Sequence, residues 1–152
     1  MNNWFLCKIR YEKTMENGMN KKVTEPYLVD ALSFTEAEAR IIEEMTPFIS
    51  GEFTVSDIKR ANYSELFPSE EIEADKWYAG RLAFVTLDEK SGAEKKTYTN
   101  VLIQAADIRD AMKKLDDGMK GTMADYRSIL LKETPITDVY PYTSSITDDE
   151  AR

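Results

Sequence analysis

The sequence predicts a two-layer α+β fold, built as a tandem duplication of a β-β-α-β unit with about six strands and two helices. Three observations lead to this prediction. Several segments alternate apolar and polar residues, two segments space their apolar residues as a helix does, and a set of landmarks recurs at a nearly constant distance. A ferredoxin-like fold, or a related tandem-repeat fold, satisfies the same order of elements.

The recurring landmarks stand at both ends of the proposed unit. Trp4 and Trp77 each precede an aromatic residue and stand four positions before a basic one, and they are 73 residues apart (77 − 4 = 73). Glu65 and Asp138 each begin a short segment that ends in an aromatic residue and proline, and they have the same separation (138 − 65 = 73). A chance match would not hold over this length of chain, so the sequence predicts a duplication.

The landmarks also predict the domain boundaries. The two repeats span residues 4–68 and 77–141, and together they form a single domain of residues 1–142. Residues 143–152 are polar and acidic, with no apolar residues to anchor them, and we expect them to form a flexible tail.

The first repeat begins with two strands. Residues 4–13 alternate apolar and polar side chains, which is typical of a half-buried strand. Asn17-Gly18 supplies the positive φ that the chain needs to turn back, and residues 21–31 form the returning strand.

A helix and a third strand complete the first repeat. Ser33 or Thr35 caps the helix, since each stands three residues before a glutamate. The apolar face that should cover the sheet consists of Ala37, Ile41, Ile42, Met45 and Phe48. Residues 51–67 then predict a long third strand with a break near Ser56-Asp57.

The second repeat follows the same plan. Its first two strands are expected at residues 77–87 and 96–105, joined by a turn at Ser91-Gly92, and its helix begins after Asp107. The third strand is expected at residues 126–131, followed by an extended exit. The apolar face of this helix consists of Ile108, Ala111, Met112, Leu115 and Met119.

The composition excludes several kinds of chemistry. The chain has 152 residues, a formal net charge of −8 and no histidine. Without histidine it lacks Ser-His-Asp and Cys-His catalysis and the commonest zinc ligands. The only cysteine, Cys7, alternates with apolar neighbours and is expected to be a buried packing residue. We therefore expect no catalytic residue, no metal site and no cofactor.

The N-terminal segment and the hydropathy predict the compartment. No apolar run approaches the roughly 20 residues that cross a membrane. The first ten residues lack the charged region and apolar stretch of a secretory signal. We therefore expect a cytoplasmic protein with no membrane partner.

The aromatic and basic residues of the strands are the candidates for binding. Trp4 and Trp77 should lie on the strand faces opposite Phe5 and Tyr78, so each Trp either packs under another segment or belongs to a contact surface. The candidate ligand-binding residues are Trp4, Arg10, Lys59, Arg60, Trp77, Arg81 and Lys132.

Three functions agree with these features. The predicted function is a non-catalytic module that binds a protein partner or a second copy of itself, because exposed strands of a small sheet pair with other chains. An alternative is a small anionic or nucleotide-like ligand at the junction of the two repeats, held by Trp and basic side chains. A further alternative is single-stranded nucleic acid, which the net charge of −8 opposes.

Several phrases of the sequence also carry a resemblance: YLVDALSFTEAEARI, SGEF, IKRANYSELF, DKWY, FVTLDEKSG and ETPITDVYPY. With these phrases the chain resembles an uncharacterised domain-of-unknown-function family of small proteins from gut anaerobic bacteria and their mobile elements. The resemblance covers nearly the whole chain. It implies no activity and no binding residues, and its one implication is that such proteins often act by binding something.

Overall fold

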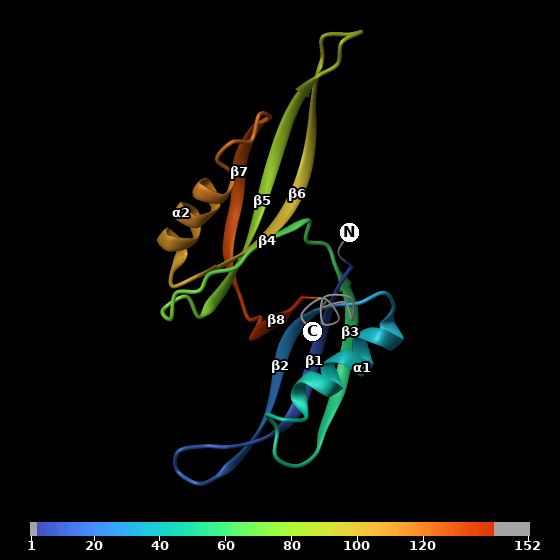
Figure 1. The fold of residues 1–152 in the computed structure, drawn as a ribbon, viewed down its shortest axis with the longest axis vertical. Coiled ribbons are helices and arrows are strands. Elements are labelled where there is room, and N and C mark those ends of the chain that lie inside the picture. Colours follow the sequence, from blue (N-terminus) through green and yellow to red (C-terminus); the bar gives the residue numbers. More distant parts are fainter. Residues whose placement is uncertain (1–2, 142–152) are drawn as a thin grey trace, which may run out of the picture. The chain divides into compact units, whose positions relative to one another are not determined.

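The computed structural model describes residues 3–141, which form a mixed α+β structure with two helices and eight strands in two sheets (Figure 1). These residues divide into two compact units. Unit 1 comprises residues 3–61 and 136–141, and unit 2 comprises residues 62–135. The predicted tail of residues 143–152 lies outside the described residues.

Unit 1 is a four-stranded sheet with one helix. Its elements are β1 (Trp4–Thr14), β2 (Asn20–Asp30), α1 (Phe34–Met45), β3 (Phe53–Ala61) and β8 (Asp138–Tyr140). The strand order is β3-β1-β2-β8. β1 pairs antiparallel with both β2 and β3, whereas β8 is parallel to β2.

Unit 2 has the same kind of sheet and helix. Its elements are β4 (Glu65–Phe67), β5 (Lys76–Leu87), β6 (Glu94–Ala105), α2 (Ile108–Gly118) and β7 (Asp125–Thr134). The strand order is β4-β6-β5-β7, with β5 antiparallel to β6 and β7, and β4 parallel to β6.

Each helix packs on one face of its own unit's sheet, as the alternation of the strands predicts. The core of unit 1 joins both elements: Phe5, Cys7, Ile9, Tyr27, Val29, Ala31, Ala37, Ile41 and Met45. The core of unit 2 does the same: Tyr78, Leu82, Val101, Ile103, Ala105, Ala111, Leu115 and Met119. Burial of these apolar side chains drives the packing of helix on sheet.

The predicted helix faces are too wide. Ile42 and Phe48 are 40% and 77% exposed, and Ile108 and Met112 are 51% and 36% exposed. Phe48 lies beyond the end of α1. Ile42, Ile108 and Met112 lie at the border of their apolar stripes, on the part of the helix surface that faces away from the sheet.

Local signals fix the helix starts and the turns. The Ser33 hydroxyl accepts a hydrogen bond from the Glu36 N–H at 3.1 Å, so Ser33 rather than Thr35 is the cap of α1. Asp107 caps α2 in the same way, accepting from the Asp110 N–H at 2.8 Å. Gly18 has the positive φ expected in the first turn. The predicted caps and the predicted turn are confirmed. Such features can be predicted from the sequence because they depend on neighbouring residues.

The prediction of about six strands is wrong, since the described residues form eight. The expected third strand of residues 51–67 is two strands, β3 and β4, and they belong to different sheets. The chain leaves the first sheet after Ala61, and the Ser64 N–H already donates to the Asn100 carbonyl in unit 2. Alternation of side chains shows that a segment is extended, but not which strand it pairs with.

At the predicted break near Ser56-Asp57 the strand continues with a bulge. The register of β3 on β1 shifts between Lys8 and Ile9, which leaves Ser56 as the extra residue. β7 has the same irregularity on β5, between Arg81 and Leu82. A bulge reverses the side of the sheet on which the following residues of that strand lie.

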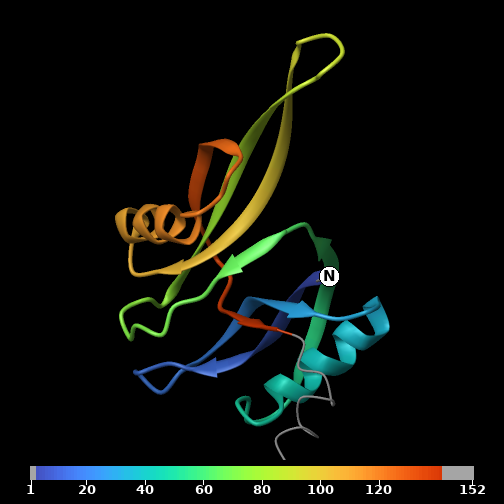
Figure 2. The same cartoon turned by 45° about the horizontal axis from the view of Figure 1, so that its top comes forward.

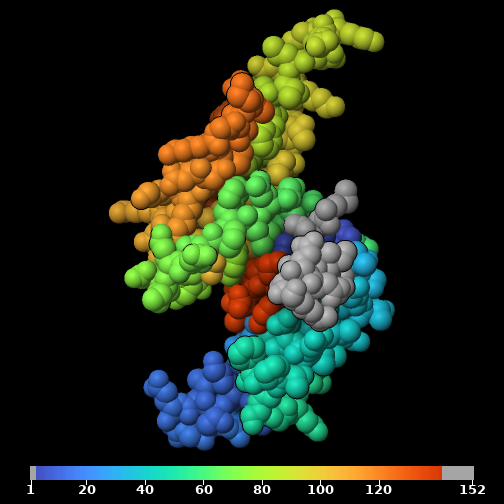
Figure 3. Space-filling view, in the orientation of Figure 1, coloured from blue at the N-terminus to red at the C-terminus, as the bar shows by residue number. Residues whose placement is uncertain are grey.

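The hairpin of β5 and β6 is long, with 12 residues in each strand, and its tip projects beyond the other strands of unit 2 (Figures 2 and 3). Neither helix among the described residues has the length and hydropathy to cross a membrane.

Candidate binding surface

The sheet of unit 2 has one face without a helix. Tyr78, Leu82, Val101 and Ile103 point to the side that α2 covers, so the alternate residues of the same strands lie on the other side. We call this side the helix-free face of unit 2. Its central residues are Ala79, Arg81 and Ala83 of β5, Tyr98, Asn100 and Leu102 of β6, and Arg127, Leu130 and Lys132 of β7.

The strand registers place the basic residues of this face close together. Arg81 lies between Leu130 and Asn100, on the neighbouring strands. One row along, Ala83 lies between Arg127 and Tyr98. Directly opposite residues on paired strands are about 4.5–5.5 Å apart, so these side chains share a small area.

Arg81 and Tyr98 form the centre of the surface. The guanidinium carbon of Arg81 lies 4.6 Å from the centroid of the Tyr98 ring, a cation–π contact. Tyr98 is 51% exposed and Leu130 is 46% exposed. The contact holds the Arg81 side chain over the sheet while its N–H groups remain available to a ligand.

The cations of this face have no acidic partners among residues 3–141. Arg81, Arg127 and Lys132 are all exposed, and none forms an ion pair with a carboxylate of residues 3–141. The acidic residues of the face, Asp125 and Glu94, lie toward the tip of the β5–β6 hairpin. The centre of the face is therefore locally positive in a chain whose net charge is −8.

The corresponding face of unit 1 is more balanced. Lys8 takes the place of Arg81, but its neighbour on β3 is Asp57, where unit 2 has Leu130. Lys59 lies beside Leu6 on the same face. Opposite charges on adjacent strands offset each other, so this face attracts an anion less strongly than that of unit 2.

The two predicted Trp residues are buried. Trp4 is 3% exposed and Trp77 is 4% exposed, and each lies on the helix-free side of its sheet. The indole Nε1 of Trp4 has no hydrogen-bond partner among the described residues. Buried indoles cannot form a stacking platform, which leaves the basic residues as the candidates for contact.

The predicted basic residues fall into three places. Arg81 and Lys132 share the helix-free face of unit 2, whereas Lys59 and Arg10 lie on that of unit 1. Arg60 instead lies on the helix side of β3, with its guanidinium 5.2 Å from the Phe5 ring and 5.3 Å from the Phe34 ring. It covers the edge of the apolar core.

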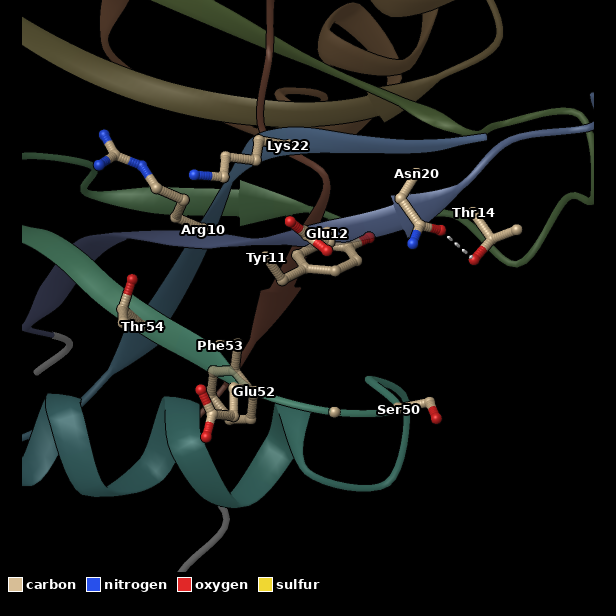
Figure 4. Close-up of a pocket in the computed structure, with 11 residues that line it drawn as sticks. Arg10, Tyr11, Glu12, Thr14, Asn20, Lys22, Ser50, Glu52, Phe53 and Thr54 are labelled. Carbon is tan, nitrogen blue, oxygen red and sulfur yellow. Dashed lines mark hydrogen bonds between the residues drawn. The ribbon is translucent and has the colours of Figure 1, made fainter. Parts of the chain in front are cut away.

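Arg10 lines a groove of about 630 Å³ at one end of unit 1 (Figure 4). Lys22 points to the same side of the sheet as Arg10, while Tyr11 and Phe53 lie on the other side of β1 and β3. Glu12 and Glu52 also line the groove. Two cations and two carboxylates offset each other, and the groove has no marked preference for an anion.

Among residues 3–141, each group with a shifted pKa has that pKa moved further from neutrality than its ordinary value. Burial raises the pKa of the Cys7 thiol to about 12, with Asp57 and Glu38 adding to the effect, so the thiol is protonated. Burial also raises the pKa values of Tyr11 and Tyr140 to about 12. The Lys114 side chain lowers the pKa of Asp110 by a hydrogen bond, which keeps that carboxyl ionised.

No cluster of carboxylate and cysteine side chains within residues 3–141 is arranged to hold a metal ion.

Sequence reasoning missed three members of the surface: Tyr98, Arg127 and Leu130. The alternation of β6 could have placed Tyr98 on the same side as Trp77 and Arg81. The side of Arg127 could not be found in this way, because the bulge in β7 lies between it and Lys132 and reverses the alternation.

Comparison with known proteins gives a family and no activity. No curated protein and no solved structure matches the chain. A family model described as a domain of unknown function, DUF4494, matches residues 3–142. The match covers nearly the whole sequence, and the chain therefore belongs to the DUF4494 family.

Proposed function

We propose that this protein is a non-catalytic binding module that holds an acidic segment of a partner protein on the helix-free face of unit 2. The observation that carries the proposal is a group of three exposed cations, Arg81, Arg127 and Lys132, none of which has an acidic partner in the described part of the chain. Unpaired positive charges on a small area attract carboxylates and can form hydrogen-bonded ion pairs with them.

The surface suits an acidic peptide better than a nucleic acid. Its exposed aromatic ring, Tyr98, already has the Arg81 guanidinium against it, so the face offers no free platform for a base. The net charge of −8 repels a long phosphate backbone. A short acidic segment needs only a local positive surface, and Leu130 offers an apolar contact beside it.

The ionisable groups support binding rather than catalysis. The shifted pKa values of Cys7 and the tyrosines move away from neutrality, whereas catalytic acids and bases usually have values near the working pH.

The test uses a fluorescein-labelled peptide of about twelve residues, rich in glutamate with two leucines, and a labelled oligothymidylate of similar charge. At low salt we expect the wild-type chain to bind the peptide, and to bind it more weakly as salt rises. The Arg81→Glu/Lys132→Glu variant should lose at least about tenfold in affinity, because it turns attraction into repulsion. Fluorescence anisotropy measures both.

A matched control separates local from overall charge. The Arg109→Glu/Lys113→Glu variant changes the charge equally in the same unit, but on α2. It should keep most of the affinity. Equal losses in both variants, or no peptide binding at all, would refute the proposal. Tighter binding of the oligothymidylate would favour a nucleic-acid partner instead.

We also infer an internal duplication, related to the ferredoxin-like folds or to another tandem-repeat fold. The strand registers support it, since Phe5 faces Val29 and Tyr78 faces Ile103 at equivalent positions. The bulges support it too, because the extra residues, Ser56 in β3 and Ile129 in β7, are 73 apart (129 − 56 = 73).

The hydrogen bonds around the helices support the same inference. Glu36 accepts from the Leu32 N–H, and Asp110 accepts from the Ala106 N–H. An experimental structure with the two bulges at non-equivalent positions would contradict the duplication. A small ligand at the junction of the repeats and a cytoplasmic location stay predictions.

A further inference from the structure

In each sheet of the described residues, the short parallel edge strand does not directly follow the other strands of that sheet along the chain. β4 follows β3 in sequence but belongs to unit 2, and β8 follows β7 but belongs to unit 1. The pairings are equivalent: Leu66 faces Leu102 in one sheet, and Val139 faces Leu28 in the other.

β8 contacts its neighbouring strand β2 in unit 1. It pairs with β2 over three residues, Tyr27 to Val29. The Tyr140 ring stacks on Tyr27 with centroids 6.0 Å apart, and the Thr137 N–H donates to the Pro26 carbonyl at 2.8 Å.

The segment contains two buried apolar side chains and accepts a hydrogen bond from a cation of α1. Ile136 and Val139 are 7% and 8% exposed, and Arg40 donates to the Pro141 carbonyl at 3.1 Å. The contacts of residues 136–141 with β2 and Arg40 do not depend on which chain supplies the segment.

We propose that the edge of β2 is an exchange site, which accepts residues 136–141 from a second copy of this chain. Two chains that donate this segment to each other form a closed dimer with twofold symmetry and keep the same strand pairing. The inference does not depend on the binding function of the helix-free face, because it uses neither Arg81 nor its neighbours.

Because residues 136–141 are covalently linked to their own chain, the protein concentration decides whether the exchange occurs. A covalently linked segment competes at an effective concentration in the millimolar range, so the closed monomer prevails at micromolar protein. Exchange between chains requires release of the segment, and a strand of three residues at a sheet edge opens more easily than the central strands. Refolding at concentrations approaching millimolar should therefore give exchanged dimers.

The experiment uses full-length chains with Cys7→Ser. One chain carries Leu28→Cys and a second, with a different affinity tag, carries Val139→Cys, since these positions face each other. The two are mixed in denaturant, refolded at about 0.5 mM and oxidised. We expect a disulfide between the two chains, with a yield that rises with concentration and is at least about fivefold above the control.

Two further chains make the result decisive. In the control, Met123→Cys replaces Val139→Cys, because Met123 is 98% exposed and faces no strand. The second chain carries both Leu28→Cys and Val139→Cys. At low protein concentration we expect it to form an internal disulfide, which would show that β8 pairs with β2 in these variants. An internal disulfide there, with mixed chains that give no more dimer than the Met123→Cys control, would overturn the proposal. Failure of the internal disulfide would overturn it as well, because β8 would then not lie on β2.

Discussion

Gly118→Ala should destabilise unit 2, against the usual effect of this substitution in a helix. Alanine in place of glycine within a helix normally stabilises by about 0.5–1 kcal/mol. A Cβ atom on Gly118, however, would lie 2.5 Å from Cε1 and 2.6 Å from Cδ1 of Phe67, too close for carbon atoms. Phe67 belongs to β4 and packs on the core of unit 2, so its ring has little room to move.

The magnitude follows from the two opposing effects. Overpacking costs about 1–3 kcal/mol, which exceeds the gain in helix propensity and leaves a loss of about 1–2 kcal/mol. Urea unfolding followed by circular dichroism measures this change. In a Phe67→Leu background the ring atoms are absent, and Gly118→Ala should then be neutral or stabilising.

The four chains form a double-mutant cycle with a coupling of at least about 1 kcal/mol. If Gly118→Ala raises the stability of the wild-type chain, or if the cycle shows no coupling, β4 does not pack against the end of α2 as described.

Three further predictions concern single groups. Ser33→Ala should lower stability by about 1 kcal/mol in urea unfolding, because the cap of α1 is lost, while Ser33→Asp should keep it; equal losses in both would contradict the capping role. Asp110→Asn should destabilise at neutral pH, and progressively less as the pH falls below 3.8, the ordinary pKa of an aspartate. The pKa of Asp110 is lowered in the folded state, chiefly by the Lys114 hydrogen bond, and the stability that this confers is lost as the pH falls through the lowered pKa. A difference in urea midpoint that stays constant from neutral to acid pH would contradict this reasoning. The Cys7 thiol, with its pKa raised to about 12 by burial, should react with a disulfide reagent at pH 8 only as fast as the protein unfolds, and rapid reaction of the native chain would show that it is accessible.

Local features of the fold could be predicted from the sequence. The hairpins, both helices and the cap at Asp107 depend on residues close together in the chain. Their sequence patterns, the alternation of the strands and the helical spacing of apolar residues, are therefore sufficient to predict them. The cap of α1 was ambiguous, since Ser33 and Thr35 both have the required spacing, and only the backbone conformation decides between them.

Non-local features could not be predicted. Nothing in the residues of β4 and β8 shows which sheet they join, because strand pairing depends on the whole topology. The sequence predicts only part of the candidate surface for the same reason. Arg81 and Lys132 are predicted as candidate cations, but the bulge in β7 conceals that Arg127 shares their face.

The position of β8 constrains how the protein is made. The ribosome synthesises the chain from its N-terminus. β1, β2, α1 and β3 therefore emerge long before β8, the strand that completes their sheet. Asp138 pairs with Tyr27 across about 110 residues, a separation that slows pairing through loop-closure entropy. Until residues 136–141 have emerged, the edge of β2 stays open to other strands, including those of neighbouring nascent chains. Unit 2 differs, because β4 precedes the rest of its sheet, and it acquires all its strands before unit 1 does.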